Sequence, residues 1–269
     1  MTDPLKLMCV LAHPDDESLG TGGLLARYAA EGVETYLVTA TRGERGWHGR
    51  PPEDPGPEGF GRLREAELRC AAEVLGLREV VVLDYVDGDL DQADPAEAQG
   101  LIAQQLRRVR PQVMVTFGPE GGYGHPDHIA ICQFASGAAV LAADPQAAVP
   151  GGGAPHRVSK LYHMLDTPDL MALYNTIFPE LVMHVDGVDR RPVPYPEWMI
   201  TTRVDTDAHW RTAARAIGCH TSQLVGFENF LDSLEEHHAV LVGTQTYYRA
   251  FSLVNAGRAL ETDLFEGLR

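Results

Sequence analysis

Several common signatures are missing from the 269-residue sequence, and each absence excludes a class of protein. No apolar run approaches the roughly 18 to 20 residues that a membrane-spanning helix needs, so no membrane anchor is expected. A Gly-x-Ser-x-Gly elbow for a serine nucleophile and a Walker P-loop are also missing. Positive charge is scarce, because 22 Lys and Arg stand against 38 Asp and Glu and give a net charge of −16. Such a surface repels a phosphate backbone, so nucleic acid is not an expected partner.

Cysteine is also rare, and its spacing carries information. The chain has four cysteines with no CxxC pair among them: Cys9, Cys70, Cys132 and Cys219. This pattern argues against a disulfide framework and against a thiolate zinc site. It is typical of small buried residues in a reducing cytoplasm, so we expect free thiols and a cytoplasmic location.

Apolar runs alternate with helical patterns along the first half of the chain. This alternation predicts a Rossmann-like α/β fold, in which helices cover both faces of a mostly parallel sheet in three layers. Strands are expected at residues 5–12, 34–40, 80–83 and 113–117. Helices are expected at residues 21–31, 62–75, 94–109 and 126–143.

The composition changes after Asp144 and divides the chain into two portions. Residues 1–145 are predicted to form the core of the fold. Residues 146–269 are predicted to form a smaller mixed α/β portion that completes one compact domain and caps a site at the sheet edge. In this portion we expect irregular structure with a hairpin between 167 and 196, strands at 159–164, 198–204 and 246–253, and helices at 207–218 and 230–241.

Residues 42–61 form an unusual connection between a predicted strand and a predicted helix. Six Gly and four Pro occur among these twenty residues. The segment is too long for an ordinary connection, so we predict a functional loop.

Two histidine–carboxylate motifs follow predicted strands. The first, His-Pro-Asp-Asp-Glu, begins at His13, and Pro14 must end the sheet ladder there. The second, His-Pro-Asp-His, begins at His125, after the strand at 113–117. Because the carboxyl ends of parallel strands share one edge of a sheet, we expect these side chains to lie together at that edge.

Two histidines and one carboxylate form a common ligand set for catalytic zinc. His13 and Asp16 stand three residues apart on one loop and could reach one ion. Either His125 or His128 could supply the third ligand. Asp15 is then left beside the ion, where a general base would stand. Iron(II) would accept the same ligands.

A phosphoacceptor receiver domain that binds magnesium is a rival interpretation. Asp84, Thr116 and Lys160 lie in or after predicted strands at spacings that such a domain would allow. That interpretation leaves the motif histidines unused, and magnesium prefers oxygen ligands to imidazole. We therefore favour the zinc site.

The two motifs together resemble the signature pair of the zinc-dependent N-deacetylases of the LmbE/PIG-L family. This family includes the deacetylase of mycothiol biosynthesis and the mycothiol-conjugate amidase. The resemblance rests on Ala-His-Pro-Asp-Asp-Glu at 12–17 and Gly-His-Pro-Asp-His at 124–128. It covers most of the chain, because residues 41–46, 64–68 and 220–223 also match.

The resemblance implies roles for the motif residues. Zinc is assigned to His13, Asp16 and His128. Asp15 becomes the general base that activates the attacking water. His125 matches a histidine that stabilises the tetrahedral intermediate or protonates the leaving amine.

The resemblance also implies residues around this centre. Tyr123 resembles a tyrosine that reaches toward the oxyanion. Asp127 would orient a histidine, with a carboxylate favoured by the start of a helix as the alternative. Arg64 could instead be a solvated helix residue, and Asp87 an ordinary turn carboxylate. The residues implied on the substrate side are Arg64, Glu44, Asp87 and His220.

We therefore predict a zinc hydrolase that removes the N-acetyl group from an N-acetylglucosamine-type substrate and releases free amine and acetate. One alternative is an amidase that cleaves a mycothiol-like S-conjugate. The other is a non-catalytic sugar-binding protein of the same fold. The expected partner is a small amino sugar, and a homo-oligomer is compatible with the sequence.

Overall fold

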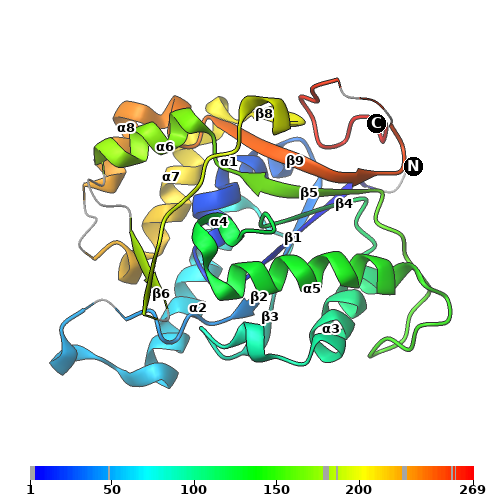
Figure 1. Ribbon diagram of the computed structural model, residues 1–269, viewed down its shortest axis with the longest axis horizontal. Coiled ribbons are helices and arrows are strands. Elements are labelled where there is room, and N and C mark those ends of the chain that lie inside the picture. Colours follow the sequence, from blue (N-terminus) through cyan, green and yellow to red (C-terminus); the bar gives the residue numbers. More distant parts are fainter. Residues whose placement is uncertain are drawn as a thin grey trace.

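A seven-stranded sheet forms the centre of the molecule (Figure 1). The computed structural model describes residues 4–47, 49–177, 182–185, 187–225, 229–255, 257 and 259–269. The strand order is β3-β2-β1-β4-β5-β9-β8. The first five strands in this order are parallel to one another, and β9 is antiparallel to both of its neighbours. The strands are β1 (Lys6–Leu11), β2 (Glu34–Thr41), β3 (Glu79–Tyr85), β4 (Val113–Thr116), β5 (Lys160–Leu165), β8 (Thr202–Asp205) and β9 (Thr244–Ser252). The expected α/β class with a mostly parallel sheet is confirmed.

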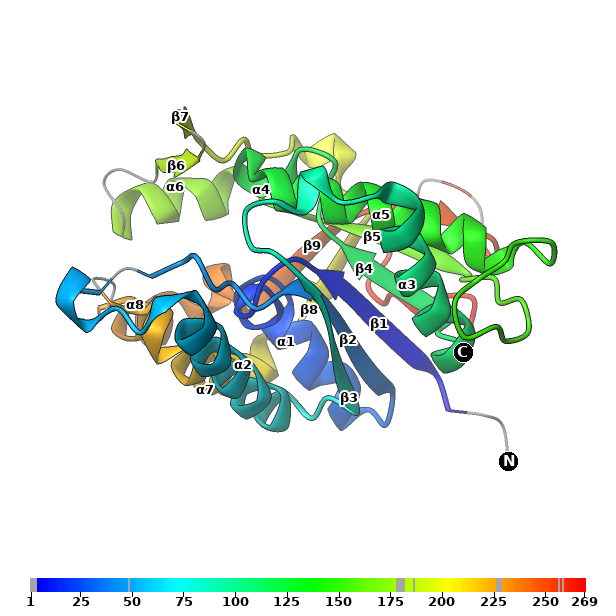
Figure 2. The same ribbon diagram turned by 90° about the horizontal axis from the view of Figure 1, so that it is seen from below.

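Helices cover both faces of this sheet (Figure 2). One face packs against α3 and α5, and the other against α1, α2 and α7. A separate hairpin, β6 (Met183–Val185) and β7 (Val188–Arg190), lies outside the main sheet. None of the described helices is both long enough and apolar enough to cross a membrane. The helices are α1 (Asp16–Ala30), α2 (Gly56–Leu75), α3 (Pro95–Val109), α4 (Gly121–Gly124), α5 (Pro126–Ala143), α6 (Pro168–Ile177), α7 (Trp210–Cys219) and α8 (Phe230–Leu241).

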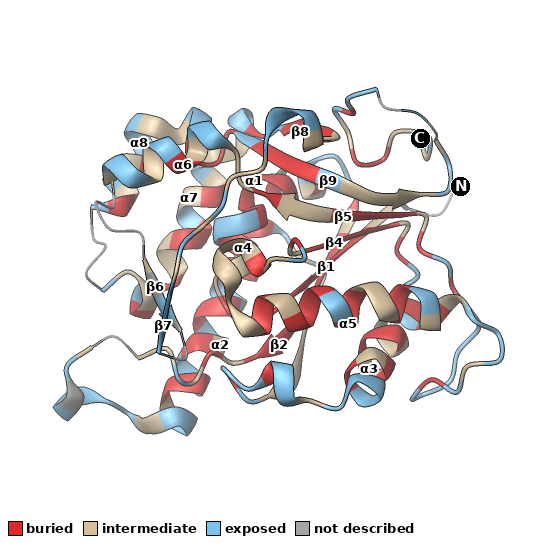
Figure 3. Ribbon diagram, viewed as in Figure 1, coloured by how far each residue is buried: buried red, intermediate tan, exposed pale blue. Residues whose placement is uncertain are grey.

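The central strand β1 is buried on both faces (Figure 3). Leu7, Cys9 and Leu11 belong to the core beneath α1 and α2. Met8 and Val10 belong to the core beneath α3 and α5. A strand with two buried faces reads as a continuous apolar run, which is why its position could be predicted.

Two helices begin earlier than the sequence predicts. Helix α1 begins at Asp16 rather than at residue 21, and its first turn carries Asp16 and Glu17, which the helix dipole favours. Helix α2 begins at Gly56 rather than at residue 62, with Pro57 in its first turn. The connection predicted at 42–61 therefore ends before Gly56. Within that connection, His48 lies outside the described residues.

Helix α6 occupies part of the segment that the sequence predicts to be irregular. Its start is capped by Thr167, whose hydroxyl accepts a hydrogen bond from the Leu170 backbone N–H. Leu170, Leu173 and Ile177 pack against the core cluster beneath α8. That spacing of three and four residues is a helical signal that the prolines around it obscure. The hairpin expected in this segment is confirmed.

The expectation that all four cysteines are free is wrong for two of them. Cys70 on α2 and Cys219 at the end of α7 form a disulfide, with their Cα atoms 5.9 Å apart. The packing of the two helices sets this distance, which suits a disulfide. A sequence separation of 149 residues gives no hint of it. Cys9 and Cys132 are buried and free, as expected. The cysteine argument for a reducing compartment therefore fails.

A buried carboxylate ties the C-terminal segment to the sheet. Glu261 is 1% exposed and accepts hydrogen bonds from Lys160 Nζ on β5 and Thr202 Oγ1 on β8, at 2.7 and 2.8 Å. Arg249 on β9 and Asn255 also donate to it. Burial opposes ionisation, but these hydrogen bonds, that of Lys160 foremost, lower the pKa of Glu261 from 4.5 to about 2.

We expect Glu261→Ala to lower the free energy of unfolding at pH 7 by about 3 to 5 kcal/mol, because it leaves the fully buried Lys160 ammonium without its counter-charge. In the wild type, the contribution of Glu261 is complete above pH 4.5 and disappears as the pH falls to 2. Urea unfolding at several pH values measures both effects. Glu58→Ala, at an exposed ion pair with Arg62, is the control and should cost less than about 1 kcal/mol. Equal losses in the two variants would contradict this assignment.

Candidate active site

The carboxyl ends of β1 and β4 lie side by side where the strand order reverses, which is the usual ligand-binding position in open α/β sheets (Figure 2). Strand β1 ends at Leu11, and the chain turns at Pro14 into α1. One carboxylate oxygen of Asp16, Oδ2, accepts hydrogen bonds from the backbone N–H groups of Ala12 and His13, at 3.1 and 2.7 Å. The turn is thereby fixed, and His13 is held at the sheet edge.

Three side chains of the two motifs converge at this edge. His13 Nδ1 lies 3.1 Å from His128 Nε2. The Asp16 carboxylate completes the triangle, because its oxygens lie 3.7 Å from His13 Nδ1 and 3.6 Å from His128 Nε2. In a tetrahedral zinc site, ligand atoms about 2.0–2.2 Å from the ion stand roughly 3.3–3.6 Å apart. The spacing and the chemistry of this donor set therefore fit a zinc-like ion.

Hydrogen bonds at the far side of each imidazole set its orientation. His13 Nε2 lies 3.2 Å from both Asp127 Oδ2 and Asp87 Oδ1, so it donates to carboxylates. His128 Nδ1 lies 3.2 Å from the carbonyl oxygen of Gly121 and donates to it. These partners direct the other nitrogen of each ring toward the triangle. A metal-binding histidine is usually held in this way.

Other groupings of possible metal ligands share His13. The ligand atoms of His13, His125 and His128 lie within 4.8 Å of one another, as do those of His13, Asp87 and Asp127. Asp127 and Asp87 are already hydrogen-bonded to His13 Nε2, the nitrogen away from the triangle. Asp16 has a second oxygen, Oδ1, on the His128 side. His13, Asp16 and His128 form a further grouping, in which Nδ1 of His13 lies 3.7 Å from Asp16 Oδ2 and Nε2 of His128 lies 3.6 Å from Asp16 Oδ1.

The electrostatics of this cluster favour positive charge. Burial opposes protonation of His13, but hydrogen bonds to Asp127 and Asp87 and the charge of Asp16 outweigh it and raise the pKa of His13 to about 10. The pKa of His128 lies well below its ordinary value, because the ring is buried and lies beside His13. The site thus places the His13 imidazole, which binds a proton strongly, next to the His128 imidazole, which stays neutral.

Asp15 lies beside the triangle in an unusual backbone conformation, with φ 117° and ψ −28°. Its Oδ2 is 3.2 Å from Arg64 Nη2. Burial raises the pKa of Asp15, and the charge of Arg64 partly offsets that rise. Burial, together with the neighbouring Asp15, raises the pKa of Asp16 to about 7. Both carboxyl groups are therefore more basic than a solvent-exposed aspartate.

Arg64 is 4% exposed, so the alternative of a solvated helix residue is wrong. Its guanidinium donates to the carbonyl oxygens of Pro14 and Gly43. A Cβ atom on Gly43 would collide with this guanidinium, so only glycine fits at that position. Arg64 thus joins α2 to the turn that carries Asp15 and to the connection after β2.

His125 and Tyr123 lie on the β4 side of the cluster. The ring of His125 is 4.8 Å from those of His13 and His128, and its Nδ1 accepts a hydrogen bond from the Asp127 backbone N–H. The Tyr123 ring is 5.8 Å from that of His125. Burial and the nearby carboxylates raise the pKa of Tyr123, which keeps its hydroxyl protonated as a hydrogen-bond donor.

Asp127 and the predicted substrate residue Asp87 lie beside His13, and Glu44 contacts Asp87 in turn. Asp127 is fully buried and accepts hydrogen bonds from the backbone N–H groups of Gly88 and Leu90, at 2.7 and 3.1 Å. Asp87 is 7% exposed, and its backbone N–H donates to Glu44 Oε1. Glu44 Oε2 is buried without a hydrogen-bond partner among the described residues. Asp127 therefore orients His13 from the first turn of α5, and Glu44 has an unused acceptor oxygen.

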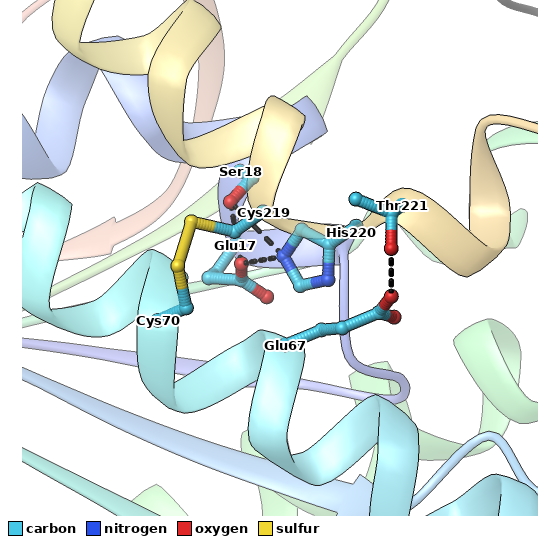
Figure 4. The surroundings of a disulfide bond; sticks show 7 residues. All are labelled: Glu17, Ser18, Glu67, Cys70, Cys219, His220 and Thr221. Atoms are coloured by element: carbon cyan, nitrogen blue, oxygen red, sulfur yellow. Dashed lines mark hydrogen bonds and ion pairs between the residues drawn. A yellow bond between two sulfur atoms is a disulfide. The ribbon is translucent and has the colours of Figure 1, made fainter.

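His220 reaches this region from the C-terminal portion of the chain (Figure 4). It is 2% exposed, and its Nε2 lies 2.7 Å from Glu17 Oε1. The sequence prediction singles out His220 but misses its partner Glu17. The sequence offers one signal for this pair. Glu17 belongs to the motif at 12–17 and His220 to the matching segment at 220–223, and a carboxylate and an imidazole can form a hydrogen bond. Lys160, which the rival receiver interpretation would place in its site, instead pairs with Glu261.

Comparisons with known proteins identify relatives of this chain. Residues 8–139 match the family model described as PIG-L, GlcNAc-PI de-N-acetylase. The chain is 34% identical to a 1D-myo-inositol 2-acetamido-2-deoxy-alpha-D-glucopyranoside deacetylase of Kineococcus radiotolerans, over 100% of this chain and 84% of the relative. It is 36% identical to the protein of the same description from Streptomyces avermitilis, over 98% and 97%. The crystal structure of the conserved protein TT1542 from Thermus thermophilus superposes with a TM-score of 0.67 at 26% identity, over 94% and 97%.

We expect Asp127→Ala to lower the free energy of unfolding by roughly 2 to 4 kcal/mol, because it leaves the backbone N–H groups of Gly88 and Leu90 without acceptors. The matched control is Asp94→Ala, which removes the exposed N-cap of α3 and should cost about 1 kcal/mol. Chemical denaturation of both variants measures the difference. A loss at Asp127 no larger than that at Asp94 would show that this carboxylate does not join the strand ends.

Proposed function

This chain belongs to the PIG-L family of de-N-acetylases, and we propose that it is a zinc-dependent hydrolase that removes the N-acetyl group from an N-acetylglucosamine-type substrate. The observation that carries the proposal is the triangle of His13 Nδ1, His128 Nε2 and the Asp16 carboxylate, with atoms 3.1 to 3.7 Å apart. Asp15 lies next to it, with its carboxylate outside the triangle and 3.2 Å from Arg64 Nη2. The relatives named above act on the acetamide of a glucosaminyl inositol, so a small glycoside of N-acetylglucosamine is the substrate class that we favour.

We assign the metal to His13, Asp16 and His128. When bound, zinc polarises the acetamide carbonyl and lowers the pKa of the attacking water. Iron(II) suits the same donor set, so the metal identity is part of the proposal.

The remaining steps of the proposal belong to side chains beside the triangle. Asp15, made more basic by burial, takes a proton from the attacking water while the water oxygen bonds to the carbonyl carbon. The Tyr123 hydroxyl donates a hydrogen bond to the oxygen that gains negative charge. His125 protonates the nitrogen as the C–N bond breaks, which releases free amine and acetate.

The substrate side of the proposal uses three residues near the ends of β2 and β3. Glu44 and Asp87 offer carboxylate oxygens to sugar hydroxyls, and the unpartnered Glu44 Oε2 is suited to accept such a bond. Arg64 would contact the substrate beyond the acetylated sugar. His220 is also predicted to bind substrate. Its hydrogen bond to Glu17 allows a different role, the positioning of Asp15.

We also propose the finer features of the architecture. The order β3-β2-β1-β4-β5 supports a Rossmann-like core within residues 1–145 that continues into β5. Residues 146–269 would complete one domain and form the rim of the active site. A cytoplasmic location and a homo-oligomer stay predictions.

We expect metal-dependent release of free amine from N-acetylglucosaminides with different aglycones. Protein stripped of metal by a chelator should be inactive, and one equivalent of zinc should restore turnover, because the attack needs a polarised carbonyl. A fluorogenic amine assay measures the release, and the order of rates across aglycones identifies the substrate. No release from any glycoside by zinc-loaded protein, with cleavage of a thiol S-conjugate instead, would favour the amidase. Sugar binding without any cleavage would favour a non-catalytic role.

Two substitutions separate chemistry from metal binding. Asp15→Ala should keep one zinc per chain and lose at least about 100-fold in kcat, because general-base catalysis contributes 10²- to 10⁴-fold. His128→Ala should lose zinc affinity itself. His238→Ala, at a histidine on α8 that pairs with Asp207, is the control and should change neither quantity. Metal analysis and initial rates give both readouts, and wild-type turnover by Asp15→Ala would refute the mechanism.

A further inference from the structure

The proposed general base, Asp15, has a backbone conformation that needs support. Among the described non-glycine residues, only Asp15, Asp84 and Arg110 have positive φ. Such a conformation is unfavourable for a residue with a Cβ atom and persists only where the surroundings fix it. The contacts that hold the Asp15 backbone therefore determine where its carboxylate lies.

Glu17 is the side chain that holds this backbone. Its Oε2 accepts a hydrogen bond from the Asp15 N–H at 3.0 Å, and the residue is 0% exposed. Its other oxygen, Oε1, lies 2.5 Å from Ser18 Oγ and 2.7 Å from His220 Nε2 (Figure 4). A carboxylate without solvent needs such partners, because an unpaired buried charge is very unfavourable. His220 therefore acts on Asp15 through Glu17.

Helix α2 anchors the segment that carries His220. The disulfide of Cys70 and Cys219 ends one residue before His220. One turn earlier on α2, Glu67 accepts hydrogen bonds from the hydroxyl of Thr221 and from the backbone and side chain of Ser222, at 2.7 to 2.8 Å. The segment is thus attached to α2 on both sides of His220, and Figure 4 shows both attachments.

The same helix reaches Asp15 by a second route. Arg64, two turns before Cys70, donates to the Pro14 carbonyl oxygen and lies 3.2 Å from the Asp15 carboxylate. One rigid helix thus holds the carboxylate of Asp15 directly and its backbone through His220 and Glu17. Such support from rigid elements is what a precisely placed base requires.

We infer that Glu17 and His220 are positioning residues that hold Asp15 in its left-handed conformation, and that His220 does not bind the substrate. The inference rests on the proposed function, because it concerns the base of that reaction. His220 is 2% exposed and its Nε2 is bonded to Glu17, which leaves only the buried Nδ1 without a hydrogen-bond partner among the described residues. Loss of the pair frees the Asp15 backbone while leaving the zinc ligands and the sugar contacts in place.

The test compares three variants of the zinc-loaded protein on the N-acetylglucosaminide that the wild type cleaves fastest. His220→Ala should lower kcat about 100-fold with KM and zinc stoichiometry unchanged, because a misplacement of about 1 Å costs that much. His220→Gln, whose amide N–H can still donate to Glu17, should recover at least a tenth of the wild-type kcat. His238→Ala removes another histidine that pairs with a carboxylate, that of Asp207, outside this arrangement, and should keep wild-type kinetics.

Other outcomes overturn the inference. A higher KM at unchanged kcat in His220→Ala would make His220 a substrate contact, and wild-type kinetics would leave it without a role in the reaction. Should His220→Ala fail to fold, Ser18→Ala, which removes the hydroxyl between Glu17 and His220, should lower kcat several-fold at constant KM, and an unchanged kcat would refute the inference. A crystal structure of the folded variant gives a readout independent of activity. A positive φ retained at Asp15 in this crystal structure would refute the inference, whether or not the wild type is active. Failure of the wild type to cleave any N-acetylglucosaminide would refute only the proposed function.

Discussion

A single buried carboxylate, Asp127, joins the strand ends on which the site depends. It accepts hydrogen bonds from Gly88 and Leu90 after β3 and from His13 after β1, and it stands in the first turn of α5 after β4. Asp127 therefore fixes the separation of the two motifs and the orientation of the His13 ring. Because it is fully buried, these hydrogen bonds do not compete with water.

The site concentrates negative charge in buried and part-buried positions. Two cationic or basic side chains from distant segments balance this charge, the guanidinium of Arg64 and the imidazole of His220. The excess of carboxylates that remains is what makes the centre attractive to a divalent cation. The carboxylates at this edge of the sheet are the buried Glu17, Asp87 and Asp127 and the part-buried Asp15 and Asp16.

The elements that the sequence predicts well are those whose signals are local. The strand before His13 is an uninterrupted apolar run, and the helix at Pro126–Ala143 begins at a proline that suits its first turn. The convergence of the two motifs also follows, because parallel strands end at one edge. The sequence does not reveal the Cys70–Cys219 disulfide or the bond between Glu17 and His220. Both depend on how α7 packs against α1 and α2, and that packing joins residues 149 to 203 positions apart.

The disulfide also has a topological consequence for the sheet. Residues 70–219 form a covalently closed ring that contains β3, β4, β5 and β8, whereas β1 and β2 lie on the N-terminal tail and β9 on the C-terminal tail. In the strand order, the tail strands separate the ring strands into three groups. The ring by itself therefore cannot form a continuous sheet. Both tails must be inserted between its strands, so a proteolytic cut that removed either tail would leave ring strands with unpaired edges rather than release an intact domain.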